Sequence, residues 1–227
     1  MDFPVLFINF KTYEQATGEN AVLLAKKAEE IALKEGVSIV LVAQAVDIGA
    51  VSSSVSLPVF AQHVDPVGYG SNTGHILPEA VKAAGAVGTV LNHAENKRDN
   101  EFLEKAIARA KSVGLMVMVC AESSERAAQI AGFESKPDLI AIEPPELIGG
   151  DISVSSAQPE IITGTIEKVE AVAFIPIITG AGIKSGEDAR IAVELGSKGV
   201  FVASGIIKAE DQRKAISDLI EGLRQVF

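Results

Sequence analysis

The sequence predicts one α/β domain spanning residues 1–227, built as a parallel (β/α)8 barrel. Short apolar runs rich in β-branched residues alternate along the chain with longer segments whose apolar residues recur every three or four positions, the pattern of strand–helix units. The short runs lack polar alternation, which indicates strands buried on both faces and therefore parallel pairing. About eight such runs occur, the number that closes a parallel barrel. An open doubly wound sheet shows the same alternation, so the choice between the two depends on the chemistry at the strand ends.

The first half of the chain contains four predicted strands and one clear helix. Between the first two strands, apolar residues from Ala21 to Ile31 line one helical face. Gly36 follows this face and ends the helix, because glycine readily adopts the left-handed conformation found at helix C-termini. The predicted strands of this half are residues 5–8, 37–42, 58–61 and 88–91.

The second half repeats the strand–helix unit more regularly. The last helix shows the clearest apolar stripe, which includes Ile216, Leu219 and Leu223. No linker, charge block or break in composition divides the chain, which favours a single domain. The predicted strands are residues 115–120, 139–142, 174–178 and 199–203, and the predicted helices are residues 100–113, 124–131, 159–170, 186–195 and 210–226.

Composition and charge exclude several classes of protein. Hydrophobic residues make up 48% of the chain and charged residues 22%, so a large core is available. The net charge of -10 and the absence of a basic cluster argue against nucleic acid as a partner. No apolar run approaches the roughly 18 residues of a membrane span, and Met1 to Pro4 lack the basic start of a secretory signal. Together with the single cysteine, Cys120, these features predict a soluble cytoplasmic protein without disulfides.

Glu143 is the first candidate for chemistry, because it ends an apolar strand on the side where a parallel barrel places its active site. A segment rich in proline and glycine, residues 144–151, follows it. This composition is typical of a loop that moves as a rigid body about its two ends. Closure of such a loop would desolvate the carboxylate and raise its pKa, which suits a base that removes a proton from carbon. An isolated carboxylate in a solvated loop is the alternative interpretation.

His93 follows the fourth apolar run and is the second candidate. The next residues, 94–98, have helical character, so the imidazole is expected at a helix N-terminus, whose dipole disfavours the charged ring. A neutral imidazole can donate a hydrogen bond to a developing enediolate oxygen. A lone histidine at such a place is also often a structural residue.

Lys11 and Asn9 come at the end of the first strand, where a period of two allows both side chains to point into the barrel mouth. An acidic protein that binds an anion needs a local cation, and Glu95 is a candidate partner that would hold the Lys11 ammonium in place.

After the last two strands come two glycine turns, which occupy the usual position of phosphate sites in barrels. Glycine turns without a binding role are the alternative interpretation of these two segments. The turns contain Gly180 and Gly182, and Ser204 and Gly205.

Taken in order, these motifs resemble those of the triosephosphate isomerase family. Its Asn-aromatic-Lys is similar to residues 9–11, its His-Ser-Glu to residues 93–95, and its Glu-Pro to residues 143–144. The third-strand loop resembles residues 61–63 and 69–74, the Cys-x-x-Glu region residues 120–122, and the phosphate loops Gly182 with residues 203–205. The match covers nearly the whole chain, and it implies the TIM barrel.

The resemblance implies interconversion of dihydroxyacetone phosphate and glyceraldehyde 3-phosphate, a step of glycolysis and gluconeogenesis, without metal or organic cofactor. Glu143 then takes the proton from carbon, His93 moves protons between the two oxygens, Lys11 stabilises negative charge and Asn9 positions the substrate. Glu95 supports Lys11. The segment from Pro144 to Gly150 becomes a lid that excludes water. The implied substrate- and phosphate-binding residues are Ile148, Gly149, Gly182, Ala203, Ser204 and Gly205.

The chain is shorter than common members and resembles the archaeal branch of the family, which implies self-association, with a homotetramer favoured over a dimer. We expect the helices after the second, fourth and fifth strands to be the shortened ones. The segment from Gln62 to Thr73 resembles the loop through which subunits of the family interlock. Two alternatives stay open: another phosphate-binding barrel enzyme, such as a Schiff-base aldolase or a sugar-phosphate isomerase, and a non-catalytic protein that binds a phosphorylated metabolite.

Overall fold

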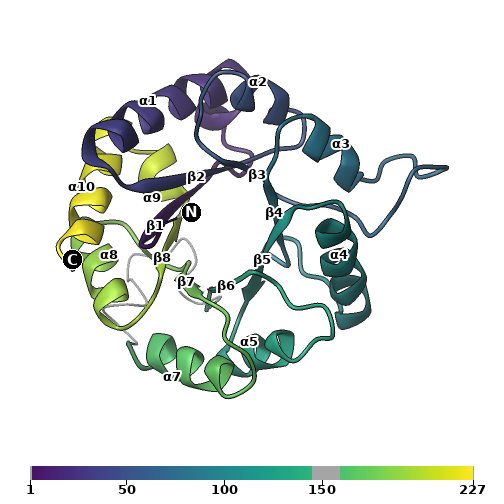
Figure 1. Ribbon diagram of the computed structural model, residues 1–227. Coiled ribbons are helices and arrows are strands. Elements are labelled where there is room, and N and C mark those ends of the chain that lie inside the picture. The colour runs from purple at the N-terminus through teal and green to yellow at the C-terminus, as the bar shows by residue number, and fades with distance from the viewer. Residues whose placement is uncertain (1, 145–158, 227) are drawn as a thin grey trace.

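The computed structural model describes residues 2–144 and 159–226. The strands in these residues form one closed barrel in which β1 to β8 follow one another in chain order (Figure 1). The first strand pairs in parallel with the second and with the eighth, and this last pairing closes the sheet. The helices lie around the outside of the barrel (Figure 1). The prediction of a parallel (β/α)8 barrel is therefore confirmed, and the open doubly wound sheet is excluded.

The strands lie where the apolar runs predict them, with ends shifted by at most three residues. Their bounds are β1 Val5–Asn9, β2 Ser38–Ala43, β3 Val59–Ala61, β4 Gly88–Leu91, β5 Met116–Ala121, β6 Leu139–Ile142, β7 Ile177–Thr179 and β8 Gly199–Val202. The described helices are η1 Glu14–Ala16, α1 Glu19–Glu35, α2 Ile48–Ser52, α3 Pro78–Ala83, α4 Asn100–Ser112, α5 Ser124–Ala131, α7 Pro159–Glu170, α8 Gly186–Glu194, α9 Ser204–Ile207 and α10 Gln212–Arg224.

The helices are shortened in part where the sequence predicts it. The helix after the second strand, α2, has 5 residues, and the helix after the fifth, α5, has 8. The predicted shortening of the helix after the fourth strand was wrong, because this helix, α4, has 13 residues. It also has a full amino-terminal cap in which Asp99 accepts the N–H of Phe102. The third unit is short instead: α3 has 6 residues, since much of the chain there forms the connection from 62 to 77.

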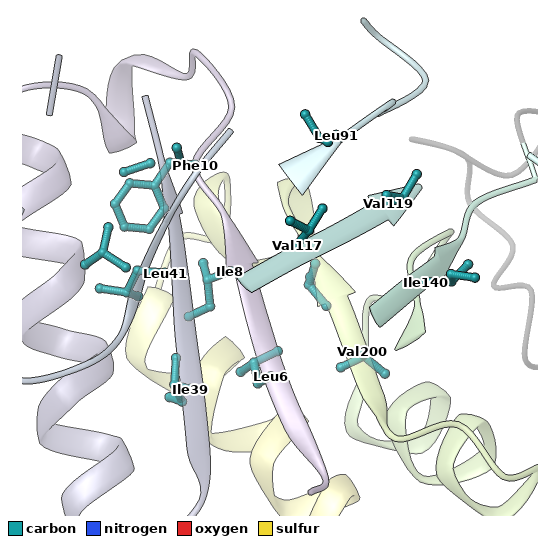
Figure 2. Close-up of a cluster of buried hydrophobic side chains, with 14 of the residues drawn as sticks. Leu6, Ile8, Phe10, Ile39, Leu41, Leu91, Val117, Val119, Ile140 and Val200 are labelled. Atoms are coloured by element: carbon teal, nitrogen blue, oxygen red, sulfur yellow. The ribbon is translucent and has the colours of Figure 1, made fainter. Parts of the chain in front are cut away.

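Side chains of each strand alternate between two separate cores. In β1, Val5 and Phe7 belong to the cluster inside the barrel. Leu6 and Ile8 belong to the outer cluster, which packs against the helices (Figure 2). The interior contains three aromatic rings among aliphatic side chains, with Phe7 in edge contact with Phe60 at 5.7 Å and with Phe201 at 6.3 Å between ring centroids. Apolar side chains therefore fill the lumen, and only its mouth is open to polar residues.

This alternation also sets which residues face the mouth at the carboxyl ends of the strands. Residue 9 continues the inward series 5 and 7 of β1, and residue 143 continues the inward series 139 and 141 of β6. The side chains of Asn9 and Glu143 are consequently placed at the mouth by strand geometry alone. Both are buried.

The connection between β3 and α3 contains a segment, residues 65–76, that projects away from the barrel (Figure 1). Two hydrogen bonds close its base. The N–H of Asp65 donates to the carbonyl of Ile76 at 2.9 Å, and the N–H of Ile76 donates to the Asp65 carboxylate at 2.7 Å. The segment is therefore a loop closed at its base by hydrogen bonds. Its tip is exposed to solvent, and Tyr69 there has 81% of its surface accessible. None of the helices placed by the structure is long and apolar enough to cross a membrane.

Candidate active site

A pocket at the mouth of the barrel contains most of the residues that the sequence predicts for the site. Asn9 and Lys11 come from the end of β1, His93 from the end of β4 and Glu143 from the end of β6. The turn after β7 and the start of α9 complete the wall of the pocket. The described lining residues are Asn9, Lys11, Tyr13, His93, Glu143, Gly180, Gly182, Ile183, Lys184, Phe201, Val202, Ala203, Ser204 and Gly205.

Glu143 is a buried carboxylate, with 3% of its surface accessible. Burial raises its pKa to about 7, because the charged form loses its hydration, although a hydrogen bond from the Cys120 thiol and the charge of Lys11 act in the opposite direction. Among the described atoms, Glu143 Oε2 has no hydrogen-bond partner. A carboxylate with a pKa near neutrality and an unpaired oxygen is equipped to accept a proton.

Gly180 makes the space that Glu143 occupies. A Cβ atom at this position would lie 2.6 Å from Glu143 Cγ and 3.0 Å from its Oε1. Gly180 is fixed opposite the carboxylate because its N–H donates to the carbonyl of Ile142 at 3.0 Å. The sequence suggests a phosphate turn at this glycine, whereas the structure shows that it also accommodates the acidic side chain.

We therefore expect Gly180→Ala to push the Glu143 side chain from its buried position. The free energy of unfolding should fall by about 1–3 kcal/mol, the usual cost of overpacking, and the pKa of Glu143 should fall as its carboxylate gains solvent. Denaturant unfolding and carboxyl-carbon NMR titration measure the two effects. Gly164→Ala is the matched control, because a Cβ atom there meets nothing within 4 Å and alanine favours its helix α7. Equal stability of the two variants would contradict this assignment.

His93 faces Glu143 across the pocket, with Nε2 lying 3.5 Å from Glu143 Oε1. The N–H of Glu95 donates to His93 Nδ1 at 3.2 Å, so the neutral ring carries its proton on Nε2. The pKa of His93 is lowered to about 4, first by burial and then by the charge of Lys11. The ring also meets the edge of Phe201.

The predicted cause of this neutrality was wrong. Residues 94 and 95 form a turn rather than the first part of a helix, and α4 begins only at Asn100. No helix dipole therefore acts on His93 at this end. Desolvation and a neighbouring cation keep the imidazole neutral instead.

Lys11 carries a positive charge into the pocket and has a partner there. Its Nζ lies 2.8 Å from Glu95 Oε1, the ion pair that the sequence suggests, and its side chain is only 14% exposed. Lys11 points into the mouth because it adopts a left-handed conformation with φ of 46°, not because the strand continues to it. Asn9 supports this turn, since its Oδ1 accepts the N–H of Lys11 at 3.0 Å, and Gln62 donates to the Lys11 carbonyl at 2.8 Å.

The wall of the pocket formed after β7 and β8 is built for an anion. Gly182 adopts a φ of 69° and Ala203 immediately precedes α9, whose first residues, Ser204 and Gly205, line the pocket. The first N–H groups of a helix have no partner within it, so they are available to a bound anion. Tyr13 and Lys184 also line the pocket and are not among the residues predicted from the sequence; each follows a predicted site residue, Lys11 or Gly182, by two positions.

Two predicted binding residues, Ile148 and Gly149, lie outside the residues that the structure describes, as does the whole of the predicted lid, Pro144 to Gly150, apart from Pro144. Within residues 2–144 and 159–226, no group of three His, Cys, Asp or Glu side chains is placed to hold a metal ion. The described pocket therefore brings together a buried carboxylate, a neutral imidazole, a cation and backbone N–H groups. This set can move a proton between carbon and oxygen of a small anion.

Comparison with known proteins gives a consistent result over nearly the whole chain. Residues 4–222 match the model of a family described as triosephosphate isomerase. Among similar proteins, the triosephosphate isomerase of Methanothermus fervidus is 44% identical over 221 residues, covering 97% of this chain and 99% of the relative. That of Methanobacterium bryantii is 45% identical, covering 96% of each chain. That of Saccharolobus solfataricus is 43% identical, covering 96% of this chain and 95% of the relative.

Proposed function

Because the chain belongs to the triosephosphate isomerase family, we propose that it interconverts dihydroxyacetone phosphate and D-glyceraldehyde 3-phosphate. The family is one of aldose–ketose isomerases, so the protein is an enzyme of that class. The reaction belongs to glycolysis and gluconeogenesis, and we place it in the cytoplasm, with which the single buried thiol, Cys120, agrees.

In this proposal Glu143 removes a proton from C1 of dihydroxyacetone phosphate and later returns it to C2. His93 donates a hydrogen bond from Nε2 to the substrate oxygens and moves the proton between them while its ring starts and ends neutral. Lys11 stabilises the negative charge of the enediolate, and Asn9 holds the turn that presents Lys11. Gly182 and residues 203–205 bind the phosphate, and we propose that Ile148 and Gly149 in the lid join them.

The observation that carries the proposal is the pairing of Glu143 and His93. A carboxylate whose pKa is raised and an imidazole whose pKa is lowered face each other at 3.5 Å, and environments that separate two pKa values in this way are typical of acid–base sites. A binding protein for the same anion would not need this pair.

A coupled assay tests the function directly. Purified protein given D-glyceraldehyde 3-phosphate should form dihydroxyacetone phosphate, followed through oxidation of NADH by glycerol-3-phosphate dehydrogenase. Absence of turnover with retained binding of the substrate would favour the non-catalytic alternative. Trapping of protein with borohydride and a carbonyl substrate would favour a Schiff-base aldolase.

We also propose that the protein self-associates through the projecting segment, residues 65–76, and that the full assembly is a homotetramer. A second pocket shares Asn9, Lys11 and His93 with the active site. Its apolar lining residues are Val42, Ala45, Val46, Ile76 and Val90. Val46 at its edge is 84% exposed. An exposed tip bearing Tyr69 and a pocket with an apolar part on the same protomer are complementary features of a self-associating surface.

Tyr69→Asp is expected to dissociate the assembly, because a carboxylate at the tip would be desolvated in the proposed interface. Sedimentation velocity should show a large species for the parent protein and smaller ones for the variant. Leu33→Asp is the control, since Leu33 is 80% exposed on α1, outside the proposed interface. Identical sedimentation of Tyr69→Asp and the parent protein would argue against this interface.

A further inference from the structure

Asn92 is a buried polar residue between β4 and His93 to which the proposed mechanism gives no role. Its φ is 60°, so its backbone is left-handed, a conformation that asparagine tolerates better than most side chains other than glycine. Only 4% of its surface is accessible. Both ends of its amide are engaged: Nδ2 donates to the Cys120 carbonyl at 2.8 Å, and Oδ1 accepts the N–H of Arg98 at 2.9 Å.

The alternation of β4 shows why this residue matters for the site. Val90 points into the barrel and Leu91 packs outward, so a continued strand would turn residue 92 inward and His93 away from the mouth. The left-handed residue breaks this series directly before His93. The imidazole then faces Glu143 rather than the helix layer.

The two hydrogen bonds of Asn92 also fix both ends of the segment that carries His93. One bond ties the start of the segment to the end of β5, and the other ties its far end, Arg98, back to its start. Within the segment, the N–H of Asn96 donates to the His93 carbonyl at 2.7 Å and the N–H of Glu95 donates to Nδ1. The position of the ring and its Nε2–H form therefore depend on a segment that Asn92 holds closed.

We propose that Asn92 is a positioning residue, which turns His93 into the barrel mouth and holds segment 93–98 in the shape that fixes the imidazole against Glu143. This inference rests on the proposed isomerase function only for the kinetic part of its test. A purely structural role, that of ending β4, would affect stability and leave the state of the ring unchanged.

Asn92→Gly tests the proposal, because glycine keeps the left-handed backbone and removes both hydrogen bonds. We expect kcat to fall about 10- to 100-fold, as misplacement of a catalytic group by about 1 Å does, with KM changed less than about threefold. Ser197→Ala is the matched control. Ser197 is equally buried, and its Oγ lies 3.2 Å from the Ile177 carbonyl and 2.8 Å from that of Gly199, at the amino end of the barrel. It should lower stability and leave kcat unchanged.

Histidine ¹⁵N NMR gives a readout that does not depend on activity. In the parent protein, His93 should show the neutral Nε2–H form from about pH 5 upward, because Lys11, Glu95, Glu143 and the edge of Phe201 surround a largely buried ring. In Asn92→Gly the ring should titrate nearer its usual pKa and populate both neutral forms.

Unchanged kcat and unchanged ring signals would overturn the proposal, as would an equal loss of kcat in Ser197→Ala. A parent protein without isomerase activity would overturn the proposed function instead, and the NMR comparison would still decide the role of Asn92.

Discussion

Glu143→Gln is expected to lower kcat by about 10²- to 10⁴-fold, the range that a positioned general base contributes. Glutamine has nearly the same shape as the carboxylate but cannot accept a proton from carbon at neutral pH. Since Glu143 is buried against Gly180, the isosteric change should preserve the packing of the site. The KM for the triose phosphate should change much less than kcat, because Glu143 interacts most strongly in the transition state.

The same variant should be more stable than the parent protein at alkaline pH. The folded protein holds the Glu143 proton up to about pH 7, whereas the unfolded chain releases it near the usual value of 4.5. Between these values the folded state binds more protons, so stability decreases as pH rises through this window and the full cost applies above it. A shift of this size corresponds to a cost on the order of 3 kcal/mol.

The titration of His93 changes stability with pH in the opposite direction over part of the same pH range. Its folded pKa is about 4 and its usual value is 6.5, so the unfolded chain binds more protons between them and stability increases with pH there. The two residues therefore offset each other between about pH 4.5 and 6.5 in the parent protein. The difference in stability between Glu143→Gln and the parent isolates the contribution of Glu143.

Urea unfolding at several pH values, together with steady-state kinetics, measures both effects. Glu79→Gln is the control for removing a carboxylate. Arg109 lowers the pKa of Glu79, so this variant should lose stability at neutral pH rather than gain it. A Glu143→Gln variant with normal kcat would refute the role of the base, and one with lower stability at pH 8 would refute the desolvated state of the carboxylate.

Part of this site is predictable from the sequence because it follows the period of two of the strands. Asn9 and Glu143 extend the inward-facing series of β1 and β6, so apolar runs and their terminal polar residues place both side chains. The barrel itself is predictable for the same reason, although alternation alone does not distinguish it from an open sheet. The pairing of β1 with β8 decides that point.

The remaining features depend on single backbone residues that no period reveals. Lys11 and Asn92 adopt left-handed conformations without being glycine, and these conformations direct Lys11 and His93 into the pocket. The helical character of residues 94–98 was misleading, since the hydrogen bond from Arg98 N–H to Asn92 closes that segment as a loop. The accommodation of Glu143 by Gly180 is a contact between neighbouring strand ends, which appears only when the register of β6 and β7 is known.

Lys11→Met is expected to lower kcat/KM by about 10²- to 10³-fold, the cost of removing one preorganised group that stabilises developing negative charge. It should also move the acid limb of the pH profile to higher pH. The charge of Lys11 lowers the pKa of Glu143 and of His93, so both pKa values should rise when the ammonium is removed. More of the base is then protonated at a given pH.

Glu95→Gln is the matched comparison, because it removes the other half of the same ion pair and leaves the cation in place. The carboxylate of Glu95 raises the pKa of Glu143 and of His93, so its loss should move the acid limb to lower pH, the reverse of Lys11→Met. The loss in kcat/KM should also be smaller, since Glu95 stabilises Lys11 rather than the substrate. Profiles of kcat/KM report the free enzyme and so measure these shifts. If the acid limbs of the two variants move in the same direction, the substitutions perturb the fold of the pocket. An unshifted acid limb in Lys11→Met would show that the charge of Lys11 does not reach Glu143.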